Sequence, residues 1–133
     1  MTSHVTRKVL EIAGVDPKRL ELNWASAAEA PLFVRLITSF TDTIKQLGPL
    51  GDTEAMAEDE LRLKLSAARS AVESVKLRTR WGKLALNLRK ENDYAPEVIE
   101  AKMADKINEA MMREMAKQER TIAESGVQSA KGI

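Results

Sequence analysis

The stretch from Leu20 to Pro49 constrains the fold of this chain more than any other part of the sequence. Apolar and polar residues alternate at its start, with Leu20, Leu22 and Trp24 on one side. This period of two predicts a short, half-buried β-strand over Leu20–Trp24. Because a single strand cannot satisfy its own backbone hydrogen bonds, we expect it to complete a sheet whose other strands lie outside this chain.

An amphipathic helix is predicted directly after this strand. Ser26 and Glu29 have the spacing of a capping box, whereas Pro31 favours a helix that begins nearer Ala30. Gly48 then supplies a left-handed cap that ends the helix. The apolar residues recur in steps of four and three, which places them on one helix face: Phe33, Ile37, Phe40, Ile44 and Leu47.

Helical periodicity predicts three further helices. Their bounds are set by capping and breaking residues: from Ser3 to Gly14, from Asp52 or Thr53 to a kink near Gly82, and from Pro96 onward. We therefore expect a mainly α fold of about four helices, in which one short β-strand completes a flavodoxin-like α/β unit that is followed by a helical extension. Residues 1–51 would form the helix–strand–helix end of the α/β module, residues 52–124 the helical extension, and residues 125–133 a flexible tail.

Composition excludes several kinds of site. The chain of 133 residues contains no cysteine, which excludes thiolate chemistry, disulfides and cysteine-ligated iron–sulfur clusters, and its only histidine is His4. We find no catalytic, cofactor-binding or metal-binding constellation, and we expect the isolated chain to be colourless and redox-silent. With aromatics at 4% and six methionines, helix-on-helix packing is favoured over a sheet-rich fold.

Charge and hydropathy bear on partners and location. The formal net charge is +1, so no overall field favours nucleic acid or a membrane surface. No apolar run approaches the length of about 18 residues that a membrane span requires, and no cleavable leader is evident. We therefore expect a cytoplasmic protein with no membrane span.

A basic window lies between Glu73 and Glu91, with Trp81 at its centre. It contains no acidic residue and six cations: Lys76, Arg78, Arg80, Lys83, Arg89 and Lys90. One interpretation is a docking patch for an acidic surface or for phosphate groups, and the other is a solvated helix face with one aromatic side chain in the core. As a docking patch, it predicts that charge reversal at Arg78 and Arg80 weakens assembly with a partner.

The methionines of the last helix also allow two interpretations. Met103, Met111, Met112 and Met115 share one broad face, which suits either a partner-binding groove or the hydrophobic core. Core is the commoner outcome for such a face. Our candidate partner-docking residues therefore come from the strand, the basic window and the turn that follows it: Leu20, Leu22, Trp24, Arg78, Arg80, Trp81 and Tyr94.

The first part of the chain resembles the end of the iron–sulfur delta subunit of methyl-viologen-reducing hydrogenases, a module also found fused to heterodisulfide-reductase-like flavoproteins. Four features carry the resemblance: the helix of Arg7–Ala13, the turn of Gly14–Arg19, the segment Leu22–Glu29 with its Trp-x-Ser-Ala-x-Glu motif, and the helix Phe33–Pro49 closing in Leu-Gly-Pro. Longer family members are also similar across Leu61–Gly82 and the turn at Asn92–Tyr94, which would extend the likeness to about Arg120.

The resemblance implies partners for this chain. The family's cysteines bind a [2Fe–2S] cluster and lie upstream of the segment seen here, so this chain carries no cofactor of its own. The implied partners are a cysteine-bearing iron–sulfur chain or domain and a flavin-containing heterodisulfide-reductase-like subunit. We expect this chain to be half of a split domain, produced either by a division into two chains or by a selenocysteine codon misread as a stop.

Two function classes remain open. The first is a structural or docking subunit, or fragment, of a multi-subunit electron-transfer oxidoreductase complex that is not catalytic on its own. The second is a free-standing small helical adaptor, which could contact nucleic acid through the basic window of residues 76–90, although the nearly balanced charge disfavours this partner.

Overall fold

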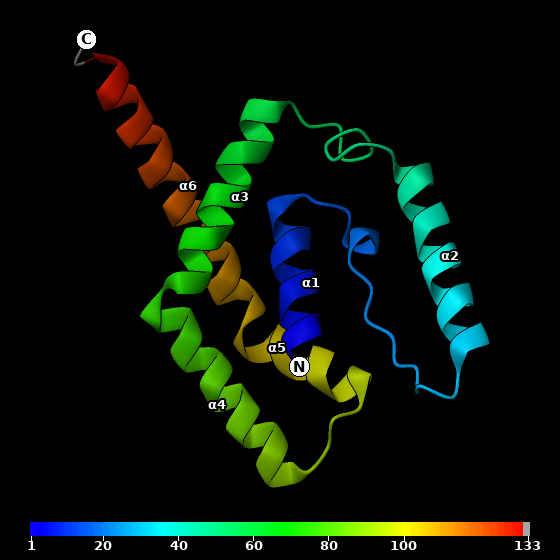
Figure 1. The fold of residues 1–133 in the computed structure, drawn as a ribbon. Helices are drawn as coiled ribbons and strands as arrows, with labels where there is room; N and C mark the ends of the chain where they lie inside the picture. Colours follow the sequence, from blue (N-terminus) through cyan, green and yellow to red (C-terminus); the bar gives the residue numbers. More distant parts are fainter. Residues whose placement is uncertain (132–133) are drawn as a thin grey trace.

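The structure is a computed structural model that describes residues 1–131, with side chains described through residue 126. Figure 1 shows the arrangement of its elements, which are α1 (Thr2–Ala13), the 3₁₀ helix η1 (Pro17–Arg19), α2 (Ala30–Leu47), α3 (Glu58–Glu73), α4 (Val75–Glu91), α5 (Pro96–Lys106) and α6 (Asn108–Lys131). The described residues thus form six α-helices and contain no β-strand.

The predicted strand over Leu20–Trp24 is therefore wrong, and so is the flavodoxin-like α/β unit. These residues run as extended coil, and Leu22 and Trp24 are 52% and 84% exposed. Alternating hydrophobicity specifies a strand only where a neighbouring strand completes the hydrogen-bond ladder. No segment among residues 1–131 pairs with Leu20–Trp24, and the expectation that this chain is half of a split domain stays a prediction.

The hydrophobic core lies between α1, α3 and α6, with α4 and α5 closing one end. The pairing of α3 with α6 is the most extensive contact in the molecule, and α1 lies against both helices (Figure 1). The largest fully buried side chains are Leu77, Leu88, Ile107 and Met111. The predicted end of α1 at Gly14 is confirmed, and this glycine caps the helix in the left-handed conformation with φ 87°.

The helix predicted from Asp52 or Thr53 to Gly82 is in fact two helices, α3 and α4. Ser74 interrupts them with extended φ and ψ angles of −66° and 138°, and its hydroxyl oxygen accepts a hydrogen bond from the Leu77 amide at 3.3 Å. This is an N-cap, which satisfies a free amide at the start of α4. The predicted kink near Gly82 is wrong, because Gly82 lies in the interior of α4.

The segment that begins at Pro96 is also divided. Ile107, with φ −124°, separates α5 from α6 and is only 1% exposed, so its side chain is buried at the bend. α6 continues as a helix to Lys131, through most of the segment predicted as a flexible tail. The flexibility of residues 125–131 stays a prediction, and residues 132–133 lie outside the described residues.

The α2 helix stands apart from the other five α-helices. Figure 1 shows it on the far side of η1 from the core, and its main contact with another element is with η1. It begins at Ala30 with Pro31 in its first turn and ends at Gly48, which has φ 71°. The start nearer Ala30 and the glycine stop are therefore confirmed, and no residue of α2 is fully buried.

Candidate docking surface

A buried ion pair holds the end of α2. The Nε of Arg19 lies 2.6 Å from Oε1 of Glu54, and their side chains are 12% and 1% exposed. Arg19 also donates hydrogen bonds to the carbonyl oxygens of Gly48 and Pro49, each at 3.0 Å, and of Leu47 at 3.4 Å. Because the last carbonyls of a helix have no partner within it, this guanidinium caps α2 from η1.

The Glu54 carboxylate organises the loops around the same point. It accepts hydrogen bonds from the amides of Asp16 at 3.1 Å and Gly51 at 2.9 Å, in addition to those from Arg19. These bonds, with that from Arg19 the largest cause, lower the pKa of Glu54 from 4.5 to about 2. One carboxylate thus joins the turn after α1 to the loop after α2. Periodicity could not reveal either residue's role, since they are 35 positions apart.

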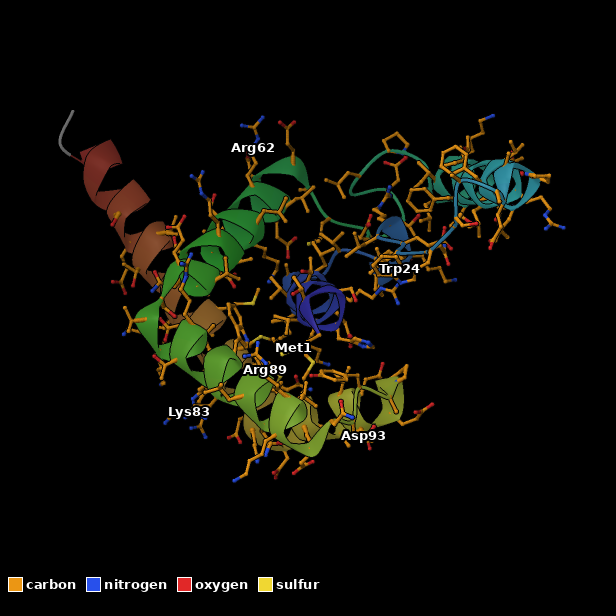
Figure 2. The ribbon with its side chains drawn as sticks, turned by 60° about the horizontal axis from the view of Figure 1, so that its bottom comes forward. Met1, Trp24, Arg62, Lys83, Arg89 and Asp93 are labelled. Atoms are coloured by element: carbon orange, nitrogen blue, oxygen red, sulfur yellow. The ribbon has the colours of Figure 1, made fainter. Side chains whose placement is uncertain are left out.

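Large apolar side chains are exposed on α2 and on the segment before it. We name this group the α2 surface, and it consists of five residues, each more than half exposed: Leu22, Trp24, Phe33, Val34 and Ile37. Figure 2 shows Trp24 on the same side of α1 as α2. Several large exposed apolar side chains near one another in the sequence are typical of interaction sites in soluble proteins.

The predicted apolar face of α2 is divided between two environments. Phe40, Ile44 and Leu47 are half-buried, and Phe40 lines a shallow hollow together with Leu20 and Pro17. Phe33 and Ile37, which belong to the same row, are exposed at 57% and 51%. The C-terminal half of the row therefore packs toward η1, whereas its N-terminal half is left without a partner within the described residues.

The candidate residues of the basic window lie on α4, away from the α2 surface. Arg80 lines a cleft between α4 and α5, where its Nη1 donates a hydrogen bond to the Lys106 carbonyl at 3.1 Å. The Nε of Arg78 instead donates to the Val72 carbonyl at 3.1 Å. These two arginines are about 200° apart around the helix, so they do not form one patch.

Trp81 and Tyr94 differ in burial. Trp81 is half-buried against the core, and its Nε1 is buried without a hydrogen-bond partner among the described residues. It lines an apolar hollow of about 460 Å³ together with Val5, Val9 and Val72. Tyr94 is 54% exposed in the turn between α4 and α5. The structure therefore does not bring the seven candidate residues together, and their docking role stays a prediction.

The methionine face of the last predicted helix is mainly core. Met103, Met111 and Met115 are 3%, 0% and 5% exposed, whereas Met112 is 51% exposed. No group of three or more His, Asp or Glu residues among those described is placed to hold a metal ion. None of the described helices combines the length and the apolar composition that a membrane crossing needs.

The α2 surface lies within a segment that is similar to known proteins. Residues 2–48 match the family of the methyl-viologen-reducing hydrogenase delta subunit. This delta-subunit segment comprises α1, η1, the extended coil and α2. The predicted resemblance is thus confirmed for about a third of the chain, while its extension to about Arg120 stays a prediction, since residues 49–133 lie outside the match.

Individual relatives are similar over the same part of the chain. One subunit of the ferredoxin:CoB-CoM heterodisulfide reductase of Methanosarcina mazei is 40% identical over 47 residues, which are 35% of this chain and 6% of that protein. The iron-sulfur subunit of the F420-non-reducing hydrogenase vhu of Methanopyrus kandleri is 41% identical over 44 residues, or 33% of each chain. The iron-sulfur subunit of the F420-non-reducing hydrogenase of Archaeoglobus profundus is 40% identical over 42 residues, or 32% of this chain and 31% of that one.

The delta-subunit segment is therefore a small part of each of these relatives. The matched region spans between 6% and 33% of their lengths. No solved structure matches the chain. What the comparisons add to the geometry is that the exposed apolar residues of α2 belong to the portion shared with hydrogenase and heterodisulfide reductase subunits.

Proposed function

We propose that this chain is a docking subunit of an electron-transfer oxidoreductase complex of the hydrogenase or heterodisulfide reductase type. One observation carries the proposal. The delta-subunit segment, which is similar to subunits of such enzymes, is also the segment in which Trp24 and the N-terminal half of α2 expose large apolar side chains. The α2 surface would bind the partner chain.

The energetics support a bound partner. Burying a large apolar side chain stabilises a complex by about 1.5–3 kcal/mol relative to leaving it exposed. Trp24 is 84% exposed and Phe33 is 57% exposed, so both keep most of this free energy available for association. Tryptophan is also among the residues whose truncation costs the most at interfaces, often about 2 kcal/mol or more. We therefore expect Trp24 to dominate the affinity.

The redox groups would lie on the partner. This chain has no cysteine, and two of the relatives are named as iron-sulfur subunits. The proposed partner is therefore a cysteine-bearing chain that holds a [2Fe–2S] cluster, in a complex that also contains a flavin subunit. In such an assembly this chain would position the electron carriers rather than carry electrons.

Purification from the native organism tests the proposal. A tagged chain should bring down hydrogenase or heterodisulfide reductase subunits, identified by mass spectrometry, together with iron and flavin in fixed ratio. The variant Trp24→Ser/Phe33→Ser should lose most of this material. A matched control is Val75→Ser/Leu86→Ser, since these two side chains are 80% and 63% exposed outside the delta-subunit segment. Equal recovery with both variants, or recovery without iron-containing chains, would refute the proposal.

A further inference from the structure

A second surface has the opposite chemistry to the α2 surface. The cleft between α4 and α5 has a volume of about 680 Å³, and four cations line it against one carboxylate. Three of the cations, Lys76, Arg80 and Lys83, come from α4, and Lys106 comes from the last turn of α5. We name this site the basic cleft. Figure 2 shows Lys83 and Trp24 on opposite sides of α1, so the two surfaces are separate.

The three cations on α4 form one row. Their spacing of i, i+4 and i+7 places them on a single face of the helix. Lys76 and Lys83 are therefore separated by about 10 Å along the helix axis, at about 1.5 Å per residue. Leu84, which is 3% exposed, also lines the cleft and gives its floor an apolar component. The cleft thus offers a line of positive charge above an apolar base.

The four cations of the basic cleft have acidic neighbours, since Asp105 lines the same cleft and Glu91 interacts with Lys106 through its charge, but they are not held in close ion pairs. Elsewhere on the surface, arginines pair with a glutamate four positions away, as in Arg62–Glu58, Arg69–Glu73 and Arg113–Glu109. Within the part of the chain whose side chains are described, no salt bridge involves any of the four cations of the basic cleft. Because like charges at i, i+4 destabilise a helix, an anion bound in the cleft would relieve this repulsion.

Arg80 is already held in position to meet an anion. Its Nη1 donates to the carbonyl of Lys106, the last residue of α5. A guanidinium has five N–H donors, so the other donors remain for a ligand. An arginine that is fixed before binding loses less conformational entropy on forming these bonds.

We propose that the basic cleft binds an acidic helix of a partner protein. Carboxylates at i, i+4 and i+7 on such a helix have the same spacing as the cations of α4. If the helix lies along α4, each of its carboxylates is opposite one of these cations. A third helix also suits a groove between two helices, where Leu84 can meet an apolar residue of the partner. The proposal does not rest on the α2 surface.

Two observations favour a protein over nucleic acid as the occupant. The net charge of the chain is only +1, whereas proteins that bind nucleic acid usually carry a strong basic excess. Among the side chains that the structure describes, no aromatic one lines the cleft, and stacking on aromatics supports most binding to single strands.

Binding of designed peptides to the full chain tests the proposal. The probe is an alanine-based helical peptide with three glutamates at i, i+4 and i+7, and its control has the same composition with the glutamates distributed around the helix. We expect the patterned peptide to bind at least about tenfold more tightly than the control peptide, measured by fluorescence anisotropy at about 0.15 M salt.

Charge-reversal variants locate the binding. Lys76→Glu/Arg80→Glu/Lys83→Glu should weaken binding of the patterned peptide by at least about tenfold. The matched variant Arg62→Glu/Arg69→Glu/Arg113→Glu makes the same change in net charge at side chains that are 76%, 83% and 75% exposed, and should bind as the unmodified chain does. If the first variant loses helicity by circular dichroism, glutamine at the same three positions replaces it.

Five results would overturn the proposal. Four of them concern binding: the absence of measurable peptide binding, equal binding of the two peptides, unchanged binding by the cleft variant, and binding of a single-stranded DNA of about 20 nucleotides at least about tenfold more tightly than the patterned peptide. Self-association of the chain that the cleft variant abolishes would also overturn it, because the occupant would then be a second copy.

Discussion

The guanidinium of Arg19 bridges the Glu54 carboxylate and the carbonyl end of α2. Its Nε lies 2.6 Å from Glu54 Oε1, while its other nitrogens reach the carbonyls of Leu47, Gly48 and Pro49. One side chain therefore caps the helix that bears the α2 surface and also fixes the loop that follows it. Both the acid stability of the protein and the attachment of α2 should depend on this bridge.

The Glu54 carboxylate should make stability depend on pH in the acid range. Its pKa is lowered from 4.5 to about 2 by its hydrogen bonds, chiefly that from Arg19. A lowered pKa stabilises the folded state fully above the unfolded value, and this stabilisation is lost as the pH falls from about 4.5 towards 2. We expect a loss of about 3 kcal/mol, since one pKa unit corresponds to about 1.4 kcal/mol.

Amide chemical shifts measure this titration directly. The Gly51 amide donates to Glu54, so its nitrogen and proton shifts should move with a midpoint near pH 2 and not near 4.5. The variant Glu54→Gln should lose the transition altogether. A midpoint near 4.5 for the Gly51 amide in the unmodified chain would contradict the hydrogen-bond arrangement.

Removal of the Arg19 guanidinium should release α2 from η1. The variant Arg19→Leu leaves a carboxylate that is 1% exposed without its cation, and breaking such a pair costs about 3 kcal/mol. Hydrogen exchange of the α2 amides should accelerate, while the protection of the α3 and α6 amides is retained. The control Arg62→Leu removes an exposed pair and should change stability by less than about 0.5 kcal/mol.

Two glycines should respond in opposite directions to alanine. Gly82 lies inside α4, and an added Cβ there would meet no atom within 4 Å. Gly82→Ala should therefore raise the free energy of unfolding by about 0.5–1 kcal/mol. At Gly14, φ is +87° and an added Cβ would lie 3.0 Å from Met56 Cε, so Gly14→Ala should destabilise the protein. Thermal or denaturant unfolding monitored by circular dichroism compares the two variants.

Adjacent methionines of α6 test whether this helix face is core. Met111 is 0% exposed and Met112 is 51% exposed. Met111→Ala should lower the free energy of unfolding by about 2–5 kcal/mol because it leaves a cavity, whereas Met112→Ala should change it by less than about 0.5 kcal/mol. Similar effects of the two substitutions in denaturant unfolding would contradict the assignment of this face to the core.

The ends of helices could be predicted from the sequence wherever a single residue type determines the local backbone conformation. The ends of α1 and α2 were predicted at Gly14 and Gly48, which both adopt positive φ. The division at Ser74 was not predicted, because apolar spacing continues across it and a cap is a short-range hydrogen bond that leaves the period unchanged. The division at Ile107 was not predicted either. Its apolar side chain fits the helical spacing and is buried as expected, but its backbone lies between two helices.

Long-range relationships could not be read in this way. The alternation around Trp24 is compatible with a strand, but its conformation depends on whether another segment pairs with it. Likewise, Lys106 of the basic cleft lies outside the charged window of residues 76–90 and reaches it only through the packing of α5 on α4. The predicted docking residues Arg78 and Arg80 are close together in the window but separate on the helix.

Because α2 is attached chiefly at one point, substitutions in it should have limited effects on the rest of the fold. Interactions that share no partner contribute additively to free energy, and α2 meets the rest of the molecule chiefly at η1. If the α2 surface binds a partner as proposed, substitutions at Phe33 or Ile37 would change the affinity for that partner while the melting temperature of the α1–α3–α6 core stays constant. Recognition and folding would then be separately adjustable traits, and variation in one would not have to wait for compensation in the other.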